Sequence, residues 1–151
     1  MVKSKGKSKA KKHIDAIDSI KNLEELEREY HITEEHITLK LVLIKILEKL
    51  ESYIKILVQI LQPEEFHSLQ ECAGFDDKRK AELFDIYKSM MILHREIIKS
   101  EISGEDNEML STIAYAHSEM LGYKKYMLDV LSKMQESWKK TGTKHNIGYF
   151  G

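Results

Sequence analysis

His94 and His117 each interrupt a stripe of apolar residues, and the two stripes belong to different predicted helices. Neutral imidazole is a common metal ligand, and histidine changes its charge near neutral pH. If the two helices face each other at that level, this pair would bind a metal ion or titrate together. The alternative is a partly buried histidine whose ring is hydrogen-bonded, as buried polar groups usually are. The pattern favours that alternative.

A di-iron bundle would need a Glu-x-x-His pair on each of two helices, with single glutamates on the other two. The one such spacing runs from Glu64 to His67, in a short connector, so that set of ligands is missing. His31, Glu34, Glu35 and His36 also resemble metal ligands in type. Without a third fixed donor from elsewhere, they indicate a polar entry to a helix.

Cys72 is the one cysteine, which excludes an intramolecular disulfide and a cysteine-based zinc site. Its neighbours on the same stripe are Phe66 and Leu69, so it is interpreted as a small apolar residue. No nucleophile elbow, kinase signature or glycine-rich phosphate loop occurs in the sequence. We therefore expect neither an enzyme nor a bound cofactor.

The first twelve residues have a definite chemistry. They contain six lysines and no acidic residue: Lys3, Lys5, Lys7, Lys9, Lys11 and Lys12. Removing this segment changes the formal net charge from −1 to −7, so a basic tail precedes an acidic body. Lysines on a tether attract polyanions such as a nucleic-acid backbone, without reading its sequence. An anionic lipid surface or a purely solubilising role are the alternatives.

The elements that carry these residues follow from hydrophobic periodicity. The sequence predicts an all-α protein, an antiparallel bundle of about four helices at about 13–30, 33–62, 76–102 and 105–140, with a connector helix at 63–73. Within the second helix, Leu43, Leu47, Leu50, Ile54, Leu57 and Leu61 recur at alternating spacings of four and three. A helix this apolar must be covered by its neighbours.

Local signals place the ends of these helices. Thr33 is the expected N-cap of the second helix, and Ile32 with Ile37 has the spacing of a hydrophobic staple. Pro63 suits the first position of the connector, which Gly74 is expected to end in a left-handed conformation. Asp76 or Asp77 is the expected cap of the third long helix.

The last helix has the most regular seam. It is predicted to run through Leu110, Ile113, His117, Met120, Lys124, Met127, Leu131, Met134 and Trp138. Lys124 is costly on such a seam if it is buried, and Gly122 weakens a helix unless another backbone approaches it. Residues 115–126 are therefore the least core-like part. The predicted partner-binding residues there and in the C-terminal tail are Tyr115, Tyr123, Lys124, Tyr126, Tyr149 and Phe150.

Together these features predict a disordered tail at 1–12, one helical-bundle domain at 13–142 and a short tail at 143–151. The leading hypothesis is a non-enzymatic cytoplasmic protein that binds another macromolecule, with its lysine tail as an electrostatic tether to nucleic acid. An alternative is a chaperone or adaptor that holds a protein client through helix 105–140 and the C-terminal tail. This layout resembles, in architecture alone, that of small secretion-export chaperones. A metal-binding bundle enzyme ranks third, and a protein partner or a homo-oligomer is expected.

Overall fold

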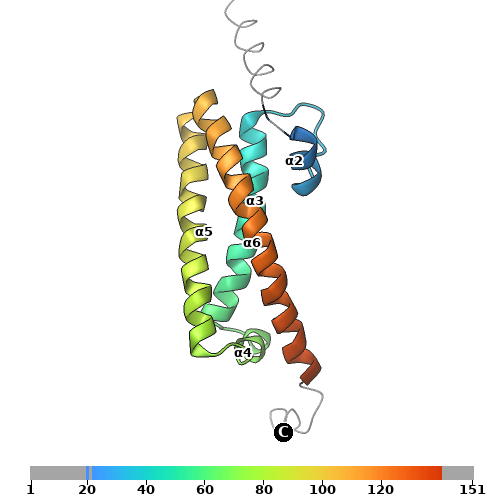
Figure 1. Cartoon of the computed structure of the whole chain (residues 1–151), viewed down its shortest axis with the longest axis vertical. Coiled ribbons are helices and arrows are strands. Elements are labelled where there is room, and N and C mark those ends of the chain that lie inside the picture. The colour runs from blue at the N-terminus through green and yellow to red at the C-terminus, as the bar shows by residue number, and fades with distance from the viewer. Residues whose placement is uncertain (1–19, 21, 141–151) are drawn as a thin grey trace, which may run out of the picture. The chain divides into compact units, whose positions relative to one another are not determined.

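The fold is all-α, as the periodicity predicts. A computed structural model describes residue 20 and residues 22–140, and that part of the chain contains helices and no strand. Figure 1 labels the helices, whose bounds are as follows. They are α2 (Leu23–Glu29), α3 (Leu39–Leu61), α4 (Phe66–Cys72), α5 (Asp77–Ser103) and α6 (Asp106–Lys140).

The chain divides into two compact units. Unit 1 consists of Met1–Glu51 and Ile92–Met120, and unit 2 of Ser52–Met91 and Leu121–Gly151. The three long helices α3, α5 and α6 each contribute one part to each unit. The core of unit 1 includes Leu26, Leu39, Leu43, Ile46, Leu50, Leu93, Ile97, Met109 and Ile113. The core of unit 2 includes Leu57, Ile60, Phe75, Leu83, Met90, Met127 and Val130.

The first described helix is shorter than predicted. Asn22 adopts a left-handed conformation with φ of 65°, so the helix begins at Leu23 and does not run unbroken from residue 13. The remainder of the predicted helix, at 13–19 and 21, lies outside the described residues. His31 is also left-handed, with φ of 51°, and turns the chain after the helix. Left-handed residues at both sides isolate a seven-residue helix.

The second predicted helix begins later than expected. Thr33 is not its N-cap, because α3 begins at Leu39 and the backbone N–H of Leu41 donates to Thr38 Oγ1 at 3.1 Å. The physical reason is burial. Ile37 is the one apolar residue between 33 and 38, whereas Leu39 is fully buried. A helix through residues 33–38 would have covered almost no apolar surface.

The connector also differs from the prediction. α4 begins at Phe66, so Pro63 is not its first residue. Gly74 does not adopt a positive φ; among the described glycines Gly104 does, at 68°. The residue that follows α4, Ala73, is right-handed, so the helix ends without a left-handed cap. The predicted cap of the next helix is confirmed, because Asp76 Oδ1 accepts the backbone N–H of Arg79 at 2.7 Å.

The predicted seam of α6 is offset by one residue at every second position. The buried line is Met109, Ile113, Ala116, Met120, Tyr123, Met127, Val130, Met134 and Ser137. This line keeps four of the predicted positions and replaces the other five by their preceding residues. Leu131 and Trp138, which were predicted to lie on the seam, are 42% exposed. Both lines have alternating spacings of three and four, so spacing alone does not choose between them.

Among the described residues, no helix is long and apolar enough to cross a membrane.

Candidate functional site on the last helix

The second half of α6 carries a row of exposed apolar side chains, all in unit 2. We call this row the α6 face; its members are Leu121, Leu128, Leu131 and Trp138, which are 38%, 58%, 42% and 42% exposed. Leu121 and Leu128 are seven residues apart, as are Leu131 and Trp138, so they share one side of the helix. Large apolar side chains gathered in one row on a surface indicate an interaction site.

The sequence alone did not identify two members of this face. Leu121 and Leu128 belong to no predicted site, and Leu131 and Trp138 were assigned to the core. A signal was present, because leucines at 121 and 128 lie outside the predicted seam. An apolar row beside a complete seam indicates a second contact surface.

Trp138 is held in place by α4. Its indole Nε1 donates to Glu71 Oε1 at 2.7 Å, although the ring is partly exposed. In the same region, a Cβ on Gly74 would lie 3.7 Å from Ser137 Cβ, so the end of α4 lies against α6. The orientation of the tryptophan is therefore fixed by its hydrogen bond to α4.

Another side of α6 in unit 2 contacts α5. The guanidinium of Arg79 makes ion pairs with Glu82 and Asp129 and lies 5.4 Å from the ring centroid of Tyr126. The Tyr126 hydroxyl is buried and has no hydrogen-bond partner among the described residues. Burial raises the pKa of Tyr126, and the opposing effect of Arg79 is smaller. This cluster fixes α5 to α6.

The predicted partner-binding residues divide into four groups. Tyr115 is exposed, whereas Tyr123 is buried and its hydroxyl is 2.6 Å from Ser89 Oγ. Lys124 and Tyr126 are half-buried. Tyr149 and Phe150, like the predicted nucleic-acid-binding lysines at 3–12, lie outside the described residues. Tyr123 therefore contributes to the core of unit 2.

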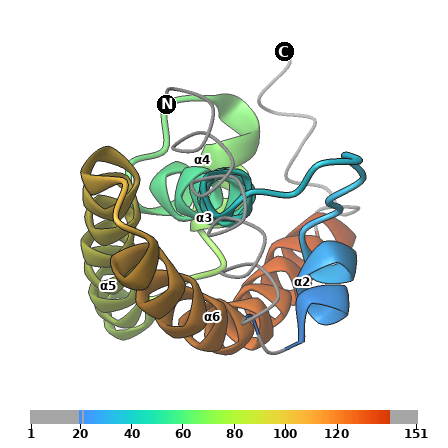
Figure 2. The ribbon, with the colours of Figure 1, turned by 90° about the horizontal axis from the view of Figure 1, so that it is seen from above.

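In unit 1, His117 joins α6 to α2. Its Nδ1 is 2.9 Å from the Tyr30 hydroxyl, and its Nε2 is 3.2 Å from Glu25 Oε1. Figure 2 shows α2 beside α6, consistent with these contacts. Lys49 of α3 adds to the same cluster: its Nζ is 2.9 Å from both the carbonyl oxygen and the carboxylate of Glu29. These polar contacts hold α2 in place, so we call them the α2 clasp.

His94 has different partners. Its Nε2 is 3.0 Å from Glu51 Oε1, and its Nδ1 is 3.2 Å from Arg95 Nη1. The two histidines therefore take part in separate clusters within unit 1. In the described part of the chain, no group of three or more His, Cys, Asp or Glu side chains is placed to hold a metal ion.

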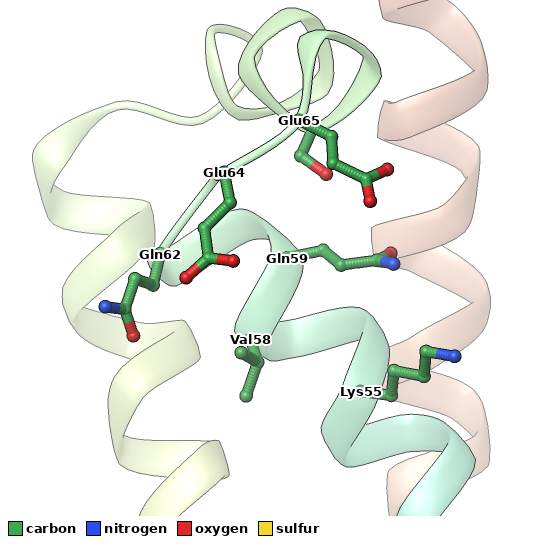
Figure 3. A pocket seen from close by; sticks show the side chains of 7 residues that line it. Lys55, Val58, Gln59, Gln62, Glu64 and Glu65 are labelled. Carbon is green, nitrogen blue, oxygen red and sulfur yellow. The ribbon is translucent and has the colours of Figure 1, made fainter.

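Two hollows lie side by side on the second half of α3, in unit 2, and share Val58 and Gln62. The first, of about 310 Å³, is lined mainly by polar residue types: Lys55, Val58, Gln59, Gln62, Glu64, Glu65 and Ser68. Figure 3 shows that Lys55 and Gln59 extend from α3 in a similar direction, with Glu64 and Glu65 on the segment before α4. The second, of about 470 Å³, is more apolar and is lined by Val58, Leu61, Gln62, Lys80, Ala81, Phe84 and Tyr87.

These hollows are weaker candidates than the α6 face. The two rings that line the second hollow already have partners: Phe84 stacks on Tyr87, and the neighbouring Lys88 Nζ lies 5.4 Å from the Phe84 ring centroid. In the first, Glu65 pairs with His67 at 3.2 Å.

No protein-family model, no curated protein and no solved structure matches this chain.

Proposed function

We propose that this chain is a non-enzymatic protein-binding module that holds a helix of a partner protein on the α6 face. The row of four exposed apolar side chains at helical spacing carries this proposal. An amphipathic partner helix presents its own apolar residues at the same three-four-seven spacings, so the two rows can interdigitate. Fully covering one leucine stabilises a complex by roughly 1.5–3 kcal/mol before the cost of association.

The orientation of Trp138 supports the same proposal. Aromatic anchors that are held in place before binding are frequent at the centres of protein interfaces. Trp138 combines a large ring with a fixed indole N–H, which donates to Glu71. It is therefore the side chain on the α6 face from which we expect the largest single contribution to binding.

The test is a native pull-down of the full chain from its source cells, treated with nuclease, in which stoichiometric proteins are identified. The test variant carries Leu128→Glu and Leu131→Glu, which place two charges on the α6 face. We expect a stoichiometric partner that survives nuclease and is lost with the variant. A partner that the double variant retains would contradict the proposal.

A matched control is available in unit 1. Ile92 and Ile102 are 64% and 79% exposed, so Ile92→Glu with Ile102→Glu makes the same chemical change on other helix surface. This control should retain the partner. Circular dichroism of both variants should show unchanged helicity, because none of the four side chains is in the core.

A second candidate function follows from the six lysines in residues 1–12. We propose that they contact nucleic-acid backbone and tether the module electrostatically. The test is binding of generic RNA and DNA across a salt series, with and without residues 1–12. We expect affinity to fall steeply with salt and to be lost on deletion; affinity unchanged by the deletion would contradict the tether.

A further inference from the structure

Lysines border most of the α6 face, and the carboxylate of Glu71 lies at its Trp138 end. Lys124 lies in the row between Leu121 and Leu128. Lys125 and Lys139 are exposed beside the row and are two heptads apart from each other. From Leu121 to Lys140, α6 carries five lysines and two acidic residues. One of those acids, Asp129, pairs with Arg79. A surface of this kind favours a partner whose apolar row is bordered by carboxylates.

The chain itself provides an example of such a helix on α6. α2 has the sequence LEELERE, with four glutamates and one arginine, and it buries Leu26. It contacts α6 through Glu25, whose carboxylate lies 3.2 Å from His117 Nε2. In unit 1, a short helix rich in glutamate therefore buries one leucine and contacts α6 through a glutamate that lies beside an imidazole.

The line that α2 contacts continues along α6. His117, Leu121, Lys124, Leu128 and Leu131 follow one another at spacings of four, three, four and three in one unbroken helix, so they lie on one side of it. His117 is covered by α2, whereas Leu121, Leu128 and Leu131 are exposed. The α6 face thus continues, with its leucines and Lys124, the side of α6 on which α2 meets His117.

We propose that the α6 face takes an acidic amphipathic helix from a partner protein, a helix of the same kind as α2. The partner's leucines cover Leu121, Leu128 and Leu131, and its glutamates lie beside Lys124, Lys125 and Lys139. This inference rests on the proposed function and adds the charge of the partner to it. Anionic membrane surface and a second copy of this chain are the competing occupants.

The test uses Trp138, the one tryptophan of the chain, as the reporter. The probes are two designed helical peptides with leucines at heptad spacing, one bordered by glutamates and the other by lysines. The full chain is titrated with each peptide while tryptophan emission is recorded. Covering the partly exposed indole should shift its emission to shorter wavelength. His117 lies about 31 Å away along α6, at about 1.5 Å per residue, so a peptide bound in place of α2 would leave that emission unchanged.

We expect saturable binding of the acidic peptide, at least about tenfold tighter than that of the basic peptide, and weakening as salt rises from about 50 to about 300 mM. The variant Lys125→Glu with Lys139→Glu should reverse the preference between the peptides. The control, Lys78→Glu with Lys133→Glu, reverses two charges of the same unit away from the α6 face and should keep the original preference.

Equal binding of both peptides, or tighter binding of the basic one, would overturn the inference and leave the proposed function standing. No binding of either peptide would overturn the inference, and the pull-down would then decide the proposed function separately. Binding of phosphatidylserine vesicles in place of the acidic peptide would assign the face to a membrane surface and overturn it. Self-association that Leu128→Glu abolishes, with no peptide bound, would assign the face to a second copy and also overturn it.

Discussion

The two units of this chain use similar helices but differ in their surfaces. The described part of unit 1 contains fourteen acidic and six basic residues, a net charge of −8. The described part of unit 2 contains nine acidic and ten basic residues, a net charge of +1. Among the described residues, eight of the eleven exposed large apolar side chains belong to unit 2. Unit 1 is thus the acidic unit, and unit 2 has the apolar surface.

The difference follows from how α6 is covered. In unit 1 the line through His117 is covered by α2, which Tyr30, Glu25 and Lys49 hold by polar contacts. In unit 2 the corresponding line carries leucines that remain exposed. A helix with two apolar rows needs two sets of neighbours. In the described part of the chain, α2 is such a neighbour in unit 1, whereas the leucines of the α6 face remain exposed in unit 2.

The largest expected effect tests whether Leu128 of the α6 face is exposed in the isolated chain. Leu43→Ala removes a fully buried side chain of unit 1 and should destabilise the protein by about 2–5 kcal/mol. Leu128→Ala removes a side chain that is 58% exposed and should change stability by no more than about 0.5 kcal/mol. Urea unfolding followed by circular dichroism measures both. Similar losses for the two variants would mean that Leu128 is covered.

The α2 clasp should give a smaller effect. Tyr30→Phe keeps the ring and removes the hydroxyl that meets His117 Nδ1, so we expect a loss of about 1 kcal/mol. Hydrogen exchange followed by mass spectrometry should show faster exchange in α2, with the second half of α6 unchanged. Tyr115→Phe is the control, because that side chain is exposed. Unchanged exchange in α2 would mean that its apolar contacts hold it without the clasp.

A change in the middle of α6 should raise stability. A Cβ at Gly122 would meet nothing within 4 Å, so no close approach requires glycine there. Gly122→Ala should therefore stabilise the chain by about 0.5–1 kcal/mol, because alanine loses less backbone entropy in a helix. The control is Gly104→Ala, which should destabilise because Gly104 has φ of 68°. Thermal unfolding of the two variants should shift in opposite directions; a destabilising Gly122→Ala would contradict the structure.

The smallest effect concerns Tyr126. Burial raises the pKa of its hydroxyl above the usual 10.0, so the folded chain holds that proton at a pH where the unfolded chain releases it. The contribution of Tyr126 to the free energy of unfolding should therefore be constant below about pH 10. It should fall as the pH rises from there toward the raised pKa of the folded chain. Absorbance titration of the phenolates, compared with that of Tyr126→Phe, measures the shift. The difference between the two curves is the titration of Tyr126 alone, and we expect it to lie above the usual pKa of 10.0. A difference that titrates at the usual pKa would contradict the burial of the hydroxyl.

Much of the fold was predictable because it depends on local rules. Alternating three-four spacing identified α3, α5 and α6, and Asp76 was a correct cap because its carboxylate is placed by the chain itself. The start of α3 was not predictable in the same way. Thr33 and Thr38 are both good caps, and only the burial that begins at Leu39 selected the second.

The candidate site was the least predictable part. Two lines along α6, one through Leu131 and Trp138 and the other through Val130 and Ser137, satisfy the same periodicity. The two lines share Met127 and Met134; at the alternate positions they differ by one residue, which is about 100° about the helix axis. The sequence by itself determined that α6 is an amphipathic helix with more apolar residues than one seam needs. The tertiary structure alone decided which row is buried, because burial depends on neighbouring helices that are distant in sequence, and it thereby left Leu121, Leu128, Leu131 and Trp138 at the surface.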